Sequence, residues 1–417
     1  MKRNVVVLGA LYQRVFFIIL LVFCSSSQAA EGITYQQEKF GPHVAHILTI
    51  NPEYYDLKYV LGQEGSCGRE SVREIAERYG AIAAINGGFF HMGGGKDGVC
   101  AGISKEQHIW NALPMKTRGA MGIGQKGRTL IFDRLGALGK ISFMVPEGAL
   151  QTLSFTALNK APQGKEVAVF NRHYGRYTRT PRERYEVVIE DGQVARRQLG
   201  GNSSIPEKGW VPSFVADAKD IPTFHKGMPV QVEVEVMPQL GFTQKPDWET
   251  VEDVIGGAPI LRHKGKAIDW TPEKFLESFI VQRHARTVMC VMPDKKWKWI
   301  VLDHTSGQGI RDMTYQKVYQ LLRNQGKTPQ QIQEMTVAEM TQAVQASEEE
   351  PIEGLTLAEL AQYIQALGCE EALNLDGGSS STLYYEGDIL NIPYGDEPYK
   401  DKRLPWVGDA LLVLPKK

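Results

Sequence analysis

Two carboxylates stand where an apolar run ends, and this setting suits acid–base chemistry. Asp376 follows the run Ala372–Leu375, and Asp303 follows the run Ile300–Leu302. A strand end holds a polar side chain on a rigid scaffold, which is a usual place for a catalytic group. Two such carboxylates can share the roles of general acid and general base. The alternative for Asp376 is an Asx-type turn, in which the side chain bonds only its own backbone.

Three Gly-Gly pairs also follow apolar runs. Such turns let a ligand approach the backbone closely and offer N–H groups to anions. A single pair is weak evidence, but two of the three pairs stand beside Asn86 and Asp376. The residues expected to bind substrate at these turns are Asn86, Gly87, Gly88, Gly256, Gly257, Asn374, Gly377, Gly378, Ser379 and Ser380.

A basic segment, Arg283 to Thr287, precedes the apolar run Val288–Met292. Arginine binds phosphate and carboxylate groups through a bidentate fork, so this segment suits an anionic ligand. We expect Arg283, His284, Arg286 and Thr287 to lie at the site that binds such a ligand. The alternative is a structural ion pair.

Local signals define the elements that carry these residues. Ser71 and Thr356 each have Glu three positions later, the pattern of a capping box, and the helices they open are expected to end at Gly80 and Gly368. Each helix is followed by an apolar strand and then by a Gly-Gly turn.

Most of the remaining chain reads as strands separated by turns. The expected class is α+β, with a mixed, mainly antiparallel sheet system and a few packing helices. We expect one domain over residues 32–417. The segment Thr328–Gly354 looks like an insertion, with a polar helix over Pro329–Gln345 and an acidic run at 348–350.

Composition limits the class of protein. The 417 residues include 47 Lys and Arg against 48 Asp and Glu, and 42% are hydrophobic. These values indicate a globular chain and exclude a disordered, collagen-like or polytopic membrane protein. The near-neutral charge argues against nucleic acid as a partner.

The first 29 residues have the layout of a secretory signal. Lys2, Arg3 and Arg14 give a positive start, Val15–Phe23 is apolar, and small residues stand at Ser27 and Ala29. Nine apolar residues are too few to span a bilayer, which needs about 20. We expect a cleaved signal and a periplasmic or secreted protein without a stable membrane span; an uncleaved anchor is the alternative.

The chain beyond the signal keeps four cysteines, which allow three pairings that sequence alone does not separate. Cys67 with Cys100 is the favoured pair because both flank one conspicuous loop. Cys290 and Cys369 then read as buried thiols. No cysteine spacing is typical of a metal site, and no nucleotide-binding, serine-hydrolase or zinc-protease signature occurs. No metal or cofactor is expected.

Taken together, these segments resemble the phosphodiester glycosidase family, which includes N-acetylglucosamine-1-phosphodiester α-N-acetylglucosaminidases. The resemblance runs in order from Gly32 to Leu414, and its most specific parts are Ile85–Phe90 and Asn374–Ser380. The chain departs from the family where Ala285 replaces a usual proline, where His304 and Thr305 replace the Gly-Arg that usually follows the aspartate, and where residues 328–354 extend a short link.

The resemblance implies hydrolysis of a sugar-1-phosphodiester in an envelope or extracellular glycan. Arg286, with Arg283, is then expected to hold the phosphodiester charge. Asp376 is nucleophile or water-activating base, and Asp303 is the second carboxylate. Asn86, Thr287 and Ser379 are expected to position the sugar hydroxyls and the backbone.

Two other functions fit the sequence. One is a non-catalytic glycan-binding or envelope-assembly protein that keeps the fold. The other is a metal-dependent phosphodiesterase that attacks phosphorus. The sugar, the aglycone and the oligomeric state are left open by the sequence.

Overall fold

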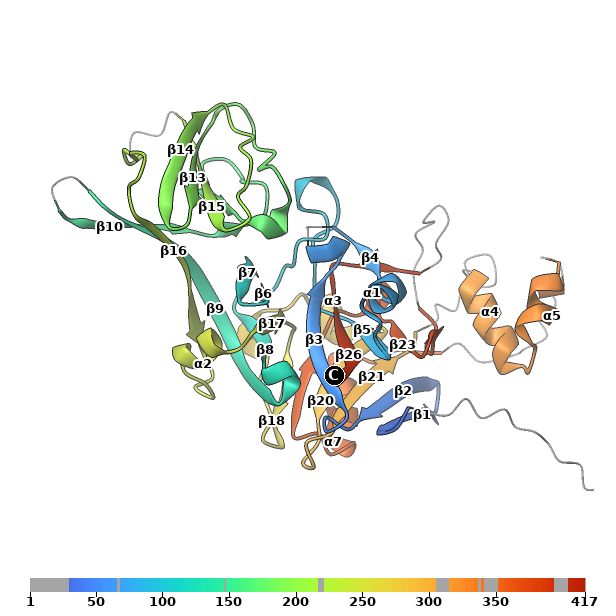
Figure 1. Cartoon of the computed structure of the whole chain (residues 1–417). Coiled ribbons are helices and arrows are strands. Elements are labelled where there is room, and N and C mark those ends of the chain that lie inside the picture. The colour runs from blue at the N-terminus through green and yellow to red at the C-terminus, as the bar shows by residue number, and fades with distance from the viewer. Residues whose placement is uncertain are drawn as a thin grey trace, which may run out of the picture.

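The computed structural model describes residues 30–65, 68–145, 148–216, 221–304, 315–336, 339–340, 352–393 and 404–416. Antiparallel sheets dominate the described residues, with a few helices packed around them (Figure 1). Only β11 and β12 pair in parallel among the described strands. The expected mainly antiparallel sheet system is confirmed, and the protein is more strongly sheet-dominated than the α+β class suggests.

The first sheet has seven strands and carries both predicted carboxylates and the basic segment. Its hydrogen-bonded order is β1 (Ile33–Phe40), β2 (His43–Ile50), β21 (Trp297–Leu302), β20 (Arg286–Val291), β22 (Glu371–Asn374), β18 (Ile260–His263) and β19 (Lys266–Ala267). Its central strands alternate between two buried faces. Val288 and Cys290 point toward α7 (Leu357–Ala366), and Met289 and Val291 point into the main core.

A second sheet completes the main core from the other side. Its order is β24 (Asp388–Ile389), β23 (Leu383–Tyr385), β5 (Ala83–Asn86), β26 (Asp409–Pro415) and β3 (Tyr55–Leu61). The antiparallel register sets Ala410 of β26 opposite Asn86 of β5. The start of β26 therefore lies beside the end of β5.

A third sheet joins this core to a separate lobe. Long strands β9 (Thr129–Met144) and β16 (Val230–Pro238) run side by side from the core toward the upper left (Figure 1). The other strands of this sheet are β10 (Leu150–Phe155), β8 (Arg118–Gly124), β17 (Asp253–Gly256), β6 (Ser104–Glu106) and β7 (Ile109–Ala112). The lobe at the far end is a five-stranded sheet made of β11 (Ala157–Leu158), β12 (Ala168–Phe170), β15 (Gly209–Val215), β13 (Arg184–Glu190) and β14 (Gln193–Leu199).

The helices begin where the capping boxes predict. Ser71 caps α1 (Val72–Tyr79), which ends at Gly80 in a left-handed conformation. Thr356 caps α7 (Leu357–Ala366), whose buried Leu357, Leu360 and Ile364 cover one face of the first sheet. The remaining short elements are α2 (Lys245–Thr250), α3 (Glu277–Val281), β4 (Glu70–Ser71) and β25 (Trp406–Val407).

Two helices, α4 (Tyr315–Asn324) and α5 (Pro329–Glu334), project from the body at the right of Figure 1. The prediction of one helix over Pro329–Gln345 is wrong. Met335 is extended, and Thr336 opens a new capping box with Glu339, so the first helix ends after one and a half turns. Residues 337–338 and 341–351 of the expected insertion lie outside the described residues.

The predicted cysteine pairing is also wrong. Cys290 of β20 and Cys369, which precedes β22, form a disulfide, and Cys100 is a buried free thiol. Cys67 lies outside the described residues. The two bonded cysteines are 79 positions apart in the chain and meet only because β20 and β22 pair. Nothing local in the sequence indicates that pairing.

Candidate functional site

The three Gly-Gly turns meet at one place. Asp376 donates its backbone N–H to the carbonyl oxygen of Gly87 at 3.0 Å, which joins the first turn to the third. A Cβ on Gly88 would collide with the carbonyl oxygen of Gly256, and one on Gly257 would collide with that of Asn374. The sequence predicts three separate turns, and in the structure these turns lie against one another. Their close approach requires glycine.

Asn86 ties the first turn to its neighbours. It is fully buried at the end of β5. Its side-chain oxygen accepts hydrogen bonds from the Thr287 hydroxyl at 2.8 Å and from the Thr382 backbone N–H at 3.1 Å. Its amide nitrogen donates to the carbonyl oxygen of Asp376 at 2.9 Å. The side chains of Asn86 and Thr287 are therefore engaged in hydrogen bonds that position the backbone at Asp376 and Thr382.

Asp376 is partly exposed at the tip of this arrangement. One carboxylate oxygen accepts from the backbone N–H of Gly377 at 2.9 Å, and the other accepts from the Ser380 hydroxyl at 2.7 Å. Burial of the carboxyl raises its pKa to about 7, against the lowering effect of these two hydrogen bonds, and the negative charge of Asp409 adds to the rise. A carboxyl that titrates near neutrality can gain or lose a proton during a reaction.

The other residues of the third turn support this carboxyl. Gly378 donates its N–H to the carbonyl oxygen of Ala285 at 2.8 Å. It has a φ of 61°, which favours glycine. Ser380 is buried and Ser379 is exposed beside it. Asn374 is buried, and its side-chain amide donates to the carbonyl oxygens of Ala258 and Leu375 at 2.7 and 2.9 Å.

Arg286 lies at the start of β20 with 1% of its surface exposed. Its Nε donates to the carbonyl oxygen of Leu355 at 3.0 Å, and Nη2 donates to that of Phe279 at 2.9 Å. No described carboxylate forms an ion pair with it. Burial lowers its pKa to about 10, so the guanidinium remains charged at neutral pH. Among the described residues, carbonyl oxygens and the Phe279 ring compensate this buried positive charge.

Phenylalanine rings connect Arg286 to the first turn. The Arg286 guanidinium lies 4.9 Å from the centre of the Phe279 ring. The Phe279 ring meets Phe89, which follows Gly88, edge to face at 5.9 Å. Both rings are partly exposed. They form an aromatic edge next to the Gly-Gly turns.

Arg283 and His284 are engaged elsewhere. Arg283 forms ion pairs with Glu359 at 2.6 Å and with Glu353 at 3.3 Å, so its charge is balanced by two carboxylates. His284 lies 3.3 Å from the carbonyl oxygen of Ser278, and burial lowers the pKa of its ring. Of the two arginines in the basic segment, Arg283 is paired with two acids, and Arg286 has no acidic partner among the described residues.

Asp303 is separated from Asp376. It is buried after β21, where His46 lies 2.9 Å from one oxygen and the Ile392 N–H donates to the other at 3.0 Å. The Tyr35 hydroxyl lies 2.8 Å from the second ring nitrogen of His46. Strand β20 lies between β21 and β22, so the backbones that bear the two carboxylates stand about 10 Å apart.

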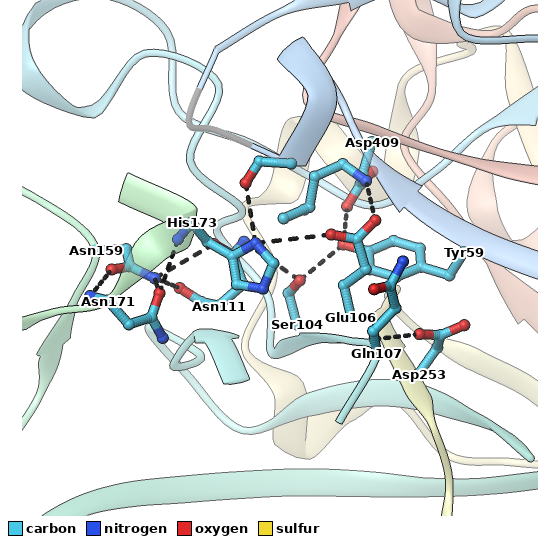
Figure 2. A network of polar contacts seen from close by, with 12 residues as sticks. Tyr59, Ser104, Glu106, Gln107, Asn111, Asn159, Asn171, His173, Asp253 and Asp409 are labelled. Carbon is cyan, nitrogen blue, oxygen red and sulfur yellow. Dashed lines mark hydrogen bonds and ion pairs between the residues drawn. The ribbon is translucent and has the colours of Figure 1, made fainter. Parts of the chain in front are cut away.

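The carboxylate that does lie near Asp376 was missed by the sequence reasoning. Asp409 begins β26 with 2% of its surface exposed, and it accepts the N–H of Gly88 at 2.7 Å. Figure 2 shows it beside Tyr59, whose hydroxyl donates to it at 2.7 Å. Its signal in the sequence is an aspartate that directly precedes an apolar run, at Ala410–Leu414. The two predicted carboxylates, Asp303 and Asp376, both follow such runs.

Two negative findings apply to the described residues. No group of three His, Cys, Asp or Glu in these ranges is arranged to hold a metal ion. No helix in the described part of the chain has the length and apolar character needed to cross a membrane.

The fold and the site define an antiparallel β-sheet protein whose polar groups gather where three Gly-Gly turns meet. The family model for phosphodiester glycosidase matches residues 335–414, which include the third turn and Asp409. The resemblance to that family is confirmed for this part of the chain. An uncharacterized protein of Rickettsia conorii is 24% identical over 258 residues, which are 60% of this chain and 85% of that protein.

Two solved structures share the fold. A hypothetical protein from Synechocystis superimposes with a TM-score of 0.67 at 22% identity, over 93% of this chain and 62% of that one. The chain thus spans less than two thirds of the Synechocystis protein. An exported-protein candidate from Burkholderia pseudomallei gives a TM-score of 0.64 at 17% identity, over 89% of this chain and 74% of that one. At these identities the likeness shows the fold alone.

Proposed function

We propose that this protein is an exported hydrolase that cleaves a sugar-1-phosphodiester at the bond between the sugar and phosphate. The observation that carries the proposal is Asp376, a partly exposed residue held where three Gly-Gly turns meet, in which burial of the carboxyl raises its pKa to about 7. The match of the surrounding residues 335–414 to the phosphodiester glycosidase family supports the same reaction.

In the proposed reaction, ionised Asp376 attacks the anomeric carbon or activates the water that does so. The phosphomonoester is a good leaving group, and Arg286 stabilises the negative charge that develops on it. This stabilisation is stronger than in water because Arg286 is buried. The absence of an acidic partner among the described residues leaves the Arg286 charge available for this role, and the Phe279 ring holds the guanidinium in place. Exposed Ser379 is available to the sugar. Asp303, engaged with His46 about 10 Å away, has no step in this scheme.

The Cys290–Cys369 disulfide supports the exported part of the proposal. Disulfides form and persist in oxidising compartments such as the periplasm and the cell exterior. Together with the signal-like first 29 residues, it supports a protein that meets envelope or extracellular glycans.

The deciding test offers the purified protein a panel of sugar-1-phosphodiesters, including α-N-acetylglucosamine-1-phosphate esters, in water enriched in oxygen-18. We expect free reducing sugar that carries the label, with and without a chelator. We expect Asp376→Asn to lower the rate by at least about a hundredfold. Asn keeps one oxygen that can accept from the Gly377 N–H, and its NH2 group can donate to the Ser380 hydroxyl oxygen, so the variant is expected to fold.

Other outcomes identify the competing functions. Label in the phosphate, with activity lost in chelator, indicates a metal-dependent phosphodiesterase. Binding without turnover on a glycan array indicates a glycan-binding protein. Full activity in Asp376→Asn contradicts the proposed mechanism.

A further inference from the structure

We propose that Asp409 is a positioning residue for the Asp376 site. It holds the Gly87–Gly88 turn against Asp376, and it keeps a second negative charge near Asp376, on the other side of Gly87. The expected effect of Asp409 on turnover rests on the proposed function. Its expected effect on the titration of Asp376 does not depend on that function.

Both carboxylate oxygens of Asp409 accept hydrogen bonds. Its first oxygen accepts from the Gly88 N–H at 2.7 Å, and its second accepts from the Tyr59 hydroxyl at 2.7 Å and from the Cys100 thiol at 3.2 Å. An ionised carboxylate only accepts hydrogen bonds, so three donors suit the charged form. The backbone contributes a further bond, from the N–H of Gly87 to the carbonyl oxygen of Asp409 at 2.9 Å.

Gly87 joins the backbones of Asp409 and Asp376. Its N–H donates to the backbone carbonyl oxygen of Asp409, and its own carbonyl oxygen accepts the backbone N–H of Asp376 at 3.0 Å. A Cβ on Gly87 would collide with the Asp409 carboxylate, so the absence of a side chain is what lets the carboxylate reach the turn. A shift of Asp409 therefore moves the backbone on which Asp376 rests.

The charges are arranged so that Asp409 affects Asp376. The titratable groups that face Asp409 are Tyr59, Cys100 and, across Gly87, Asp376. Burial raises the pKa of both Tyr59 and Cys100 well above their ordinary values, so both remain neutral donors. Burial also raises the pKa of Asp409 to about 6, below that of Asp376 at about 7. The negative charge of ionised Asp409 opposes ionisation of Asp376 and so raises the pKa of Asp376.

A polar network supports Asp409 from the lobe (Figure 2). The Tyr59 hydroxyl lies 2.7 Å from the Ser104 hydroxyl, and the Asn111 amide donates to Ser104 at 3.4 Å. Asn159 of the lobe donates to the Asn111 carbonyl oxygen at 3.0 Å. The position of Asp409 thus depends on contacts that reach the lobe.

The experiment compares the titration of Asp376 in the wild-type protein and in Asp409→Asn. Carbon-13 NMR of labelled aspartate carboxyl groups follows the titration, and Asp376→Asn assigns the signal. Asparagine keeps an oxygen for the Gly88 N–H and removes the charge. We expect the Asp376 titration to move down by about one pH unit. The matched control is Asp253→Asn, which removes another buried carboxyl whose pKa burial raises to about 6, and which bonds Gln107 instead.

An Asp376 titration that stays in place in Asp409→Asn overturns the proposal, whether or not the protein hydrolyses any phosphodiester. Where turnover is found, the acidic limb of the pH–rate profile is expected to move by the same amount. A residue with only a structural role would lower kcat equally at every pH. If Asp409→Asn does not fold, Tyr59→Phe removes one donor, and we expect the Asp409 titration itself to move upward; an unchanged titration there also contradicts the proposal.

Discussion

The side-chain amide of Asn86 donates a 2.9 Å hydrogen bond to the backbone carbonyl oxygen of Asp376, across 290 positions of sequence. Its side-chain oxygen accepts from Thr287 and from the backbone of Thr382. One buried amide therefore connects the end of β5 with β20 and with the turn that carries the predicted catalytic carboxyl. The geometry of that carboxyl depends on a residue that need not touch substrate.

Replacing Asn86 with Ala is expected to destabilise the protein by about 3 kcal/mol, because buried donors on Thr287 and Thr382 lose their acceptor. Chemical denaturation gives the change in the free energy of unfolding. Asn86→Asp is the control, since it keeps an acceptor oxygen for Thr287 and Thr382 and replaces the amide donor to Asp376 with a carboxyl group. We expect it to be less destabilising than Asn86→Ala; the reverse order would contradict the role given to the acceptor.

Replacing Gly87 with Ala is expected to disrupt the site and destabilise the protein by at least about 2 kcal/mol, because the new Cβ collides with the Asp409 carboxylate in a packed interior. Gly124→Ala is the control, since a Cβ there meets its nearest atoms at an ordinary 3.4 Å. Thermal unfolding of the two variants makes the comparison. Equal melting temperatures would show that the turn relaxes without cost.

Local features were predictable from the sequence because their causes are local. The capping boxes at Ser71 and Thr356 depend on residues three positions apart, and both helices begin as expected. The strands that end at Asn86 and Leu302 also follow from apolar runs. Each Gly-Gly turn was found in this way, since it directly follows such a run.

The grouping of these features was not predictable, because strand order decides it. Asp303 and Asp376 have the same local setting, yet β20 lies between their strands. Asp409 was not predicted as a site residue because it stands at the start of its strand, whereas Asp303 and Asp376 follow theirs. In an antiparallel sheet the start of one strand lies beside the end of the next, as Ala410 lies opposite Asn86. The Cys290–Cys369 disulfide has the same origin, in the pairing of β20 with β22.

Loss of the Cys290–Cys369 disulfide is expected to destabilise the protein by about 4 kcal/mol, since it closes a loop with a sequence separation of 79 residues. Unfolding of Cys290→Ala, and of the wild-type protein in dithiothreitol, measures the loss. Cys100→Ala is the control because Cys100 is a free thiol, and its stability should not respond to dithiothreitol beyond the wild-type response. A non-reducing peptide map that lacks the Cys290–Cys369 link would contradict the pairing.

The stability of the protein should fall as pH rises through the range in which Asp376 and Asp409 ionise. Burial raises their pKa values to about 7 and about 6, from an ordinary value of 3.8. Between pH 4 and 7 the folded protein therefore holds protons that the unfolded chain has released. Under linkage, this makes the free energy of unfolding decrease with rising pH. The contribution of these two groups is present at pH 4 and is lost by pH 7.

Urea denaturation of Asp409→Asn between pH 4.5 and 7.5 tests this sign. Asparagine has no proton to lose, so the variant should gain stability relative to the wild-type protein as pH rises. Asp294→Asn is the control, because the neighbouring Lys296 side chain lowers the pKa of Asp294. Its carboxyl is already ionised in both states across this range, so its difference from the wild-type protein should stay constant. A constant difference for Asp409→Asn as well would show that Asp409 is not the buried, late-titrating carboxyl described here.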